Sequence, residues 1–259
     1  MKKQFAFTGQ GGEYFSLILV QGLLTAITLG IYFPWAFVKI RSYLFDHLTL
    51  DGKPFSFSAK GGEVFSLFLG QYLLAAITFG IYTPWAMVRI ARYMYEKTSY
   101  DGKSFEYTAM GGEYFSLLFV QGLLISITLG IYTPWAIVKI YRFQLERSSY
   151  DGKFFSFAAD GGQYFSLLFV QGILTLITLG IYAPWAMAKI YGYLGGNVGY
   201  GGELSGRIEL DGGKLFSLFL KGYLLSAITL GIYFAWFQME LYRYYAECAS
   251  FEPAGAAAA

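Results

Sequence analysis

This sequence of 259 residues contains few of the residues that hold metal ions or perform nucleophilic catalysis. It has one cysteine, Cys248, and one histidine, His47. A single cysteine excludes an internal disulfide, and a zinc site needs several cysteine or histidine ligands. The sequence also lacks a glycine-rich phosphate loop, a carboxylate pair within an apolar run and a nucleophile beside a histidine. We therefore expect no enzymatic activity, no metal and no cofactor.

Charged residues are also scarce. They make up only 14% of the chain, whereas 56% of residues are hydrophobic and 20% are aromatic. The net charge is +2, and no stretch gathers lysine and arginine on one face. A nucleic-acid-binding protein needs such a basic surface, so nucleic acid is excluded as a partner.

Long uncharged runs are the most prominent feature that the sequence does contain. The 25 residues from Tyr14 to Val38 include no Asp, Glu, Lys, Arg or His. Similar runs span Phe65–Val88, Tyr114–Val138 and Tyr164–Ala188. Uncharged apolar runs of 18 or more residues are typical of membrane segments. The sequence therefore predicts an integral membrane protein.

These runs belong to a unit of about 50 residues that recurs five times, and a regular internal repeat defines the structural unit. We predict repeats at residues 1–50, 51–100, 101–150, 151–200 and 201–250, followed by a disordered tail at 251–259. The fifth repeat diverges, because Ala235 replaces the proline found at the same place in the other copies. It is therefore predicted to be a cap whose outer face need not meet another repeat.

Each repeat is predicted to form a helical hairpin. Gly30 and Pro34 interrupt the first run, and such residues mark helix ends and starts. We expect one helix from about Glu13 to Leu29 and a second from Pro34 to about His47. The predicted fold is therefore an all-α polytopic membrane protein with five membrane hairpins, and the alternative is one kinked crossing per repeat.

Short β-hairpins are predicted to join the repeats. Residues 49–57 alternate apolar and polar side chains around Asp51-Gly52, which is a strong signal for a two-residue hairpin turn. Copies of these strands could pair into one sheet outside the membrane, with Phe55 and Phe105 on a shared strip. If each repeat crosses twice, the positive-inside rule places these linkers in the cytoplasm.

Polar residues within the apolar runs are the first candidates for function, because a polar group in hydrocarbon needs a partner or a purpose. One set is interpreted either as a polar path or as contacts between helices: Gln21, Gln71, Gln121, Gln171 and Lys221. A second set is predicted to contact lipid headgroups or form charge pairs: Lys39, Arg89, Lys139, Lys189 and Glu240.

Three recurring motifs resemble those of the YjgN-like family of bacterial inner-membrane proteins, a domain of unknown function. They are Gly-Gly-Glu-Tyr-Phe-Ser at residues 11–16, Leu-Gly-Ile-Tyr-x-Pro-Trp-Ala at 29–36 and Tyr-Asp-Gly-Lys-x-Phe at 100–105. The resemblance covers nearly the whole chain. It implies a multi-pass helical protein of the bacterial cytoplasmic membrane and brings no catalytic residues. The compact array of five nearly identical units departs from the family pattern.

Two functions remain open from the sequence. The first is a structural, scaffolding or accessory role in the bacterial membrane, with lipids as partners and with self-association or a larger membrane complex. The second is a transporter or channel for a small solute or an ion, since repeats and broken helices recur in transporters. Near-identity of the repeats favours the first, because a solute site usually needs a few unlike polar groups at one place.

Overall fold

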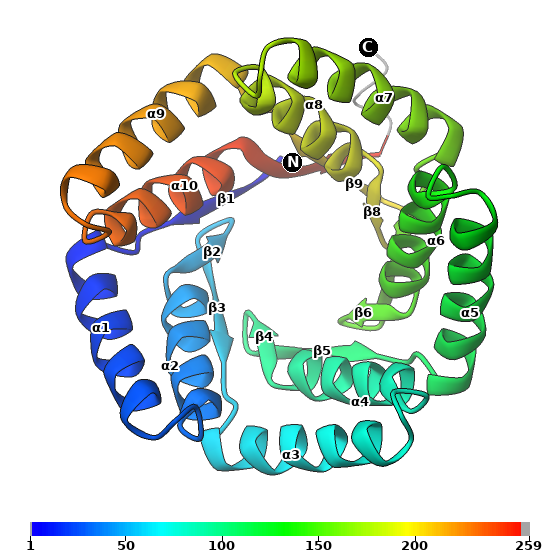
Figure 1. Cartoon of the computed structure of the whole chain (residues 1–259), viewed down its shortest axis with the longest axis horizontal. Coiled ribbons are helices and arrows are strands. Elements are labelled where there is room, and N and C mark those ends of the chain that lie inside the picture. Colours follow the sequence, from blue (N-terminus) through cyan, green and yellow to red (C-terminus); the bar gives the residue numbers. More distant parts are fainter. Residues whose placement is uncertain (1, 255–259) are drawn as a thin grey trace.

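The computed structural model describes residues 2–254, in which five repeats form a closed ring (Figure 1). Each repeat supplies a longer helix, a shorter helix and two strands. The helices are α1 (Gly11–Ile27), α2 (Phe33–Asp46), α3 (Gly61–Ile77), α4 (Thr83–Glu96), α5 (Gly111–Ile127), α6 (Thr133–Glu146), α7 (Gly161–Ile177), α8 (Ala183–Gly196), α9 (Gly212–Ile228) and α10 (Phe234–Cys248). The strands are β1 (Lys3–Phe7), β2 (Leu48–Leu50), β3 (Lys53–Phe57), β4 (Thr98–Tyr100), β5 (Lys103–Tyr107), β6 (Ser148–Tyr150), β7 (Lys153–Phe157), β8 (Val198–Tyr200), β9 (Leu204–Ile208) and β10 (Ala249–Pro253).

The ten strands pair antiparallel, each with its neighbours in sequence, into a closed barrel that we call the strand ring. In three linkers a two-residue turn joins the strands, and in the first of these Asp51 (φ 53°) and Gly52 (φ 73°) both adopt the left-handed conformation that such turns require. The turn between β8 and β9 has three residues, 201–203. Between linkers, β3 pairs with β4, so that Phe55 lies opposite Tyr100. The predicted pairing between linker copies is therefore confirmed, and it continues around the whole ring.

The ring closes through the two ends of the chain. Strand β1 pairs with β2 on one side and with β10 on the other, where Lys3 lies opposite Phe251. Helix α10 packs against β1 in the way that α2 packs against β3. The N-terminal strand thus completes the last unit. Phe251 belongs to β10, so this part of the predicted tail is an ordered strand, while residues 255–259 lie outside the described residues.

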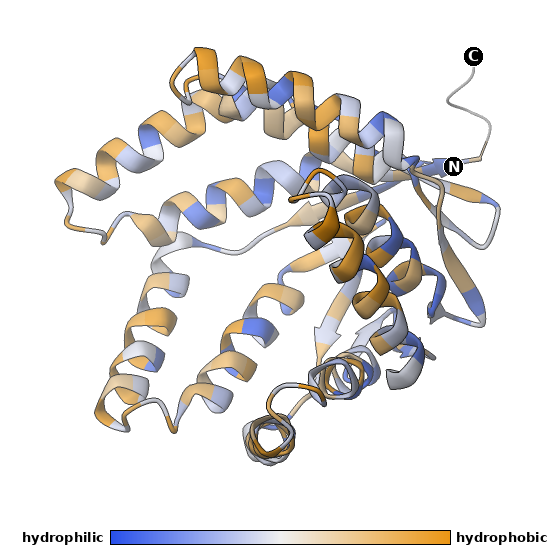
Figure 2. Ribbon diagram, turned by 45° about the vertical axis from the view of Figure 1, so that its right-hand side comes forward, coloured by the Kyte–Doolittle hydropathy of each residue, from blue (hydrophilic) through white to orange (hydrophobic). Residues whose placement is uncertain are grey.

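The helices form two concentric layers around the strand ring (Figure 1). The odd-numbered helices lie on the outside and the even-numbered helices on the inside, along the edges of a pentagon. In Figure 2 the turns between paired helices reach toward the left of the view, and the strand ring lies on the right. The helix turns and the strand ring therefore occupy opposite faces of the molecule.

Adjacent hairpins pack through a glycine and a tryptophan. A Cβ placed on Gly61, at the start of α3, would approach Trp35 Cδ1 to 2.2 Å. The same relation joins Gly111 to Trp85, and the closing contact joins Gly11 to Trp236. Below each contact lies an apolar cluster, such as the one that contains Val38, Phe57 and Val64. This contact explains the first glycine of the pair that begins every outer helix, because that glycine lies against an indole ring.

The prediction of an all-α polytopic fold is wrong, whether each repeat is assumed to cross twice or once. Ten strands form a closed ring at the centre of the molecule. Among residues 2–254, no helix combines the length and apolar character needed to cross a bilayer. The uncharged run of the first repeat is divided at its turn between α1, with 17 residues, and α2, with 14. The two helices have about the predicted lengths, but neither is long enough and apolar enough to cross a bilayer.

The central pocket and the hairpin surfaces

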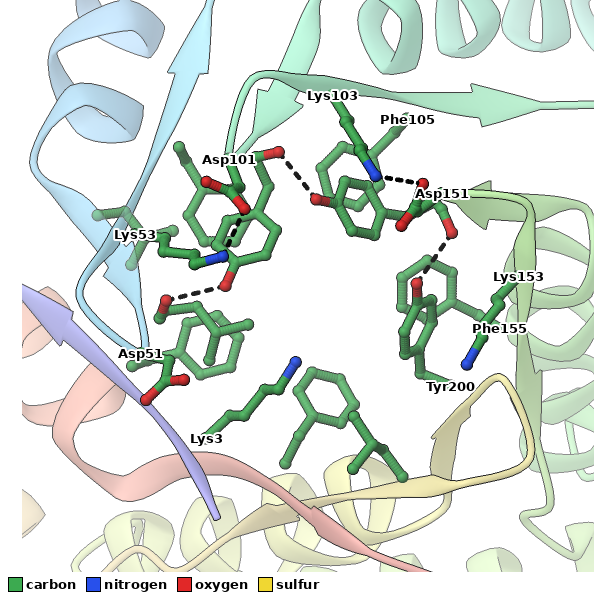
Figure 3. A pocket seen from close by; sticks show the side chains of 18 of the residues that line it. Lys3, Asp51, Lys53, Asp101, Lys103, Phe105, Asp151, Lys153, Phe155 and Tyr200 are labelled. Carbon is green, nitrogen blue, oxygen red and sulfur yellow. Dashed lines mark hydrogen bonds and ion pairs between the residues drawn. The ribbon is translucent and has the colours of Figure 1, made fainter. Parts of the chain in front are cut away.

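A pocket of about 530 Å³ lies inside the strand ring (Figure 3). Its lining comes from both linker strands of every repeat, because residues at alternate positions of a strand point to the same face. Lysines and acids from the turns surround its rim, and aromatic side chains form the wall below them. Its volume is in the usual range for small-ligand sites.

Ion pairs between successive repeats hold the rim. Lys53 Nζ lies 2.6 Å from Asp101 Oδ2, and Lys103 Nζ lies 2.6 Å from Asp151 Oδ1. Hydrogen bonding to these aspartates raises the pKa of both lysines. A third pair joins Lys153 to Glu203 at 2.9 Å. The Asp-Gly-Lys motif therefore has a second role besides the turn, since its lysine pairs with the acid of the next repeat.

A continuous aromatic wall lies beneath the rim. Phe5 stacks on Phe55, Phe55 on Phe105, and Phe105 on Phe155, with ring centroids 6.3, 6.3 and 6.4 Å apart. Phe251 adjoins Phe5 at 6.1 Å. The predicted strip of aromatic residues is thus bent into an arc around the pocket.

Tyrosine hydroxyls link the repeats around the same wall. The hydroxyl of Tyr100 donates to the carbonyl of Leu50 at 3.0 Å, and those of Tyr150 and Tyr200 donate to the preceding tyrosine carbonyls at 2.9 Å. Burial raises the pKa of these tyrosines. Their hydroxyls therefore remain protonated at neutral pH, as donation to these carbonyls requires.

The pocket is irregular where the chain ends meet. Leu204 stands where other repeats carry the rim lysine, and Gly206 stands where they carry the wall phenylalanine. Lys3 completes the series of rim residues, yet among residues 2–254 no carboxylate lies within 4.0 Å of its ammonium group. Figure 3 shows Lys3 reaching toward the middle of the pocket, apart from the Asp51 carboxylate. We call the part of the pocket formed by Lys3, Leu204 and Gly206 the closing sector. It holds one unpaired cation beside apolar side chains.

The predicted glutamines lie inside separate hairpins and do not converge on one another. Gln21 is buried, and Tyr32 of the same hairpin donates to its Oε1 at 3.2 Å. Tyr182 and Gln171 repeat this bond at 3.2 Å. The carbonyl oxygens of Gln71 and Gln121 are buried without a partner among the described residues. These contacts fit the interpretation that the glutamines join helices.

In the fifth hairpin, Lys221 and Glu240 form an ion pair of 2.7 Å between α9 and α10. The other repeats carry a cation at the position of Glu240. These four cations are exposed on the inner helices: Lys39, Arg89, Lys139 and Lys189. Lys139 and Lys189 each donate to a tyrosine hydroxyl of their own hairpin, at 2.8 and 3.1 Å. The structure thus pairs Glu240 with Lys221, which the sequence analysis had placed in the other candidate set, and it leaves the four cations at the surface.

The turns at the ends of the helical hairpins expose a bulky apolar residue in every repeat. We call residues 28–33, 78–83, 128–133, 178–183 and 229–234 the hairpin tips. Their most exposed side chains, at 92–97%, are Leu29, Phe79, Leu129, Leu179 and Leu230. Each has φ between 50° and 51°, a left-handed conformation that is unfavourable for such residues. The motif showed where the helices end, but it could not show that this residue points outward.

Backbone hydrogen bonding within the tips is complete for the N–H groups. In the first tip, Leu29 donates to the carbonyl of Ala26 at 3.1 Å and Gly30 to that of Thr25 at 2.8 Å. The Thr28 hydroxyl accepts from the backbone N–H of Tyr32 at 3.0 Å. The other four tips repeat this pattern. The tips therefore expose apolar side chains without exposing an unpaired N–H.

Comparisons with known proteins agree with the repeat. A family model described as a bacterial protein of unknown function (DUF898) matches residues 2–69, 53–113, 109–162 and 152–204. The inner membrane protein YjgN of Salmonella typhimurium is 58% identical over 48 residues, which are 18% of this chain and 12% of that protein. YjgN of Escherichia coli K12 is 47% identical over 49 residues, or 19% of this chain and 12% of that protein.

These alignments therefore span about one repeat of the chain and only 12% of the length of the curated relatives. No solved structure matches the chain. The four overlapping family matches, in contrast, reach from residue 2 to residue 204 and follow the repeats in order. On that evidence the chain belongs to the DUF898 family of bacterial proteins, the family to which its recurring motifs point.

Proposed function

We propose that this chain is a non-enzymatic scaffold of the bacterial inner membrane, anchored by its five hairpin tips, which enter one side of the bilayer. The observation that carries the proposal is the repeated tip, where an apolar side chain more than nine-tenths exposed adopts an unfavourable backbone conformation. In water, exposing these apolar side chains on an unfavourable backbone conformation does not stabilise the protein. In hydrocarbon, burying each leucine side chain contributes about 1.5–3 kcal/mol.

The hydrogen bonds of the tips support the same environment. An unpaired backbone N–H costs several kcal/mol in the hydrocarbon layer, so a segment that enters it must satisfy its own donors. Every N–H from Thr28 to Phe33 has a partner within the tip or the end of α1. The names of the curated relatives, which describe inner membrane proteins, agree with this location.

The exposed cations suggest how deeply the tips enter. Lys39 follows Tyr32 by seven residues, which corresponds to about 10 Å of helix. An ammonium or guanidinium group at this level can reach lipid phosphates while the tip lies among acyl chains. We therefore propose that Lys39, Arg89, Lys139 and Lys189 contact headgroups. The strand ring, on the opposite face, then lies in water.

The same geometry favours a scaffold over a transporter. A transport path needs polar groups that face one shared space, whereas Gln21 and Gln171 each bond within their own hairpin. The five equal anchors instead suit a ring that lies on the membrane and presents its strand ring to a partner. We propose that this partner is another copy of the chain or a larger membrane complex.

Flotation on vesicles of phosphatidylethanolamine and phosphatidylglycerol tests the anchor. The variant replaces all five exposed tip residues with serine: Leu29→Ser, Phe79→Ser, Leu129→Ser, Leu179→Ser and Leu230→Ser. We expect vesicle affinity to fall by a factor of at least about ten, because several apolar groups no longer enter lipid. A control, Phe154→Ser, removes a half-exposed aromatic residue from the strand ring and should float like the wild type. Unchanged flotation of the five-serine protein would contradict the proposal.

The scaffold role itself is tested by cross-linking and mass spectrometry after gentle extraction from the native membrane. The proposal predicts several copies of the chain or constant companion proteins in the cross-linked species. A monomer without companions would contradict the scaffold role while leaving the lipid anchor intact.

A further inference from the structure

We infer that the central pocket is a binding site for a planar aromatic carboxylate, held by Lys3 in the closing sector. This inference does not depend on the membrane role, because the pocket lies in the strand ring and not in the hairpin tips. It depends on one unpaired cation placed beside an aromatic wall in a pocket of about 530 Å³.

Lys3 differs from the other rim lysines in its charge environment. Lys53, Lys103 and Lys153 each lie 2.6–2.9 Å from an acid of the next repeat, so their charge is already neutralised. Lys3 makes no such pair among residues 2–254, and Figure 3 shows its side chain directed into the pocket. Its neighbour in sequence, Lys2, instead pairs with Glu252 at 3.1 Å. An anion entering the pocket therefore finds one ammonium group free to bind it.

The wall selects the rest of the ligand. Phe251 lies opposite Lys3 in the β1–β10 pair, and Phe5 lies two residues from Lys3 on the same face of β1. The ring centroid of Phe5 is 6.1 Å from that of Phe251 and 6.3 Å from that of Phe55. Aromatic ligands pack on such rings in offset or edge-to-face geometry, which stabilises the complex beyond the burial of apolar surface. The hydroxyls of Tyr100 and Tyr150 already donate to backbone carbonyls. The wall is therefore an apolar surface with few polar groups left for a sugar or a peptide.

The closing sector also provides the space. Gly206 occupies the position of the fifth wall phenylalanine, so a ring is missing from this side. Leu204 replaces the rim lysine and Leu50 replaces the tyrosine at the equivalent strand position. These substitutions remove two hydrogen-bonding groups from the sector that contains Lys3. A flat ring with one carboxylate matches the result, with the carboxylate on the ammonium group and the ring against leucine and phenylalanine.

Equilibrium binding of naphthalene-2-carboxylate to the purified full chain tests this inference. We expect one molecule to bind per chain, and the Lys3→Gln variant to bind at least about tenfold more weakly because the charge-assisted contact is lost. Lys2→Gln is the matched control, since it removes the same charge one residue away, outside the pocket lining. It should bind like the wild type.

A neutral probe separates loss of the pocket from loss of the charge. Naphthalene-2-carboxamide should bind equally well to the wild type and to Lys3→Gln, which shows that the variant keeps an intact pocket. Leu204→Trp should weaken both probes, because the indole fills the sector. The inference is overturned if the carboxylate does not bind the wild type, if it binds Lys3→Gln equally well, or if it binds equally well to Leu204→Trp.

Discussion

The hairpin tips and the strand ring are opposite ends of the same repeat, and they follow opposite rules. The tips expose leucine and phenylalanine, and they pair their own N–H groups. The strand ring pairs three of its rim lysines with acids and places its aromatic side chains around a central pocket. All five copies share the pattern of the tips, whereas the strand ring departs from its pattern where the chain ends meet. The proposed membrane anchor accounts for this difference between tips and strand ring, since it places one face of the molecule in an apolar medium and the other in water.

The largest effect should come from removing the buried aromatic residue at the end of β3, on the side of the strand ring that packs against the helices. Phe57 is buried in a cluster with Val38 and Val64, so Phe57→Ala should lower the free energy of unfolding by about 3–5 kcal/mol. Leu29→Ala, at an exposed tip, should change it by less than about 0.5 kcal/mol. Chemical denaturation in the same detergent compares the two. Similar losses from both variants would mean that the tip contributes to the folded core.

A second comparison concerns the two glycines at the start of an outer helix. A Cβ on Gly61 would lie 2.2 Å from Trp35 Cδ1, whereas a Cβ on Gly62 meets no atom within 4 Å. Gly61→Ala should therefore cost about 1–3 kcal/mol because the indole must move. Gly62→Ala should be neutral or slightly stabilising, since alanine favours helix. Equal effects, measured by thermal unfolding, would show that the interface between hairpins tolerates displacement of Trp35.

The tyrosine hydroxyls of the strand ring should have a smaller effect. Tyr100→Phe removes the hydrogen bond to the carbonyl of Leu50 and should cost about 1 kcal/mol. Tyr72→Phe removes a hydroxyl from a side chain that is 72% exposed on α3 and serves as the control, with no expected loss. If both variants unfold at the same denaturant concentration, the hydroxyl bonds do not stabilise the ring.

The smallest expected effect is on the acid dependence of ring closure. Hydrogen bonds from Lys2 and then Arg207 hold the pKa of Glu252 below its ordinary value of 4.5. The ionised carboxylate therefore stabilises the folded chain at pH values above 4.5, and this contribution disappears as the pH falls through the lowered pKa. The melting temperature of Glu252→Gln should change less between pH 6 and pH 3 than that of the wild type. Identical acid profiles would exclude a role for this carboxylate in closing the ring.

Much of the local structure could be predicted from the sequence. The Gly-x-x-x-Pro spacing placed the helix turns, and α1 and α2 begin and end within two residues of the predicted bounds. The Asp-Gly pairs correctly predicted two-residue turns. These features depend on short-range backbone preferences, and the chain displays the helix-turn signal in four repeats and the Asp-Gly turn in three.

The tertiary arrangement could not be predicted in the same way. That β1 completes the unit of α10 depends on a contact between the two ends of the chain, which no local pattern encodes. The uncharged run from Tyr14 to Val38 looked like a membrane crossing because hydropathy does not show that its two helices pack against the helices of neighbouring hairpins. The sequence also does not show which strands of neighbouring repeats pair. The lysines of the linkers were therefore assigned only to turns, whereas this pairing brings them to one pocket.

Spin labels at the two ends of the repeat test the central claim most directly. Leu29→Cys, at a tip, and Ser104→Cys, on the strand ring, are each labelled in a Cys248→Ala background after reconstitution into vesicles. The account predicts that oxygen, which concentrates in lipid, relaxes the tip label more strongly than a water-soluble nickel chelate does, and that the label on the strand ring shows the reverse. Equal and strong relaxation of both labels by the nickel chelate would contradict the placement of the hairpin tips in the membrane.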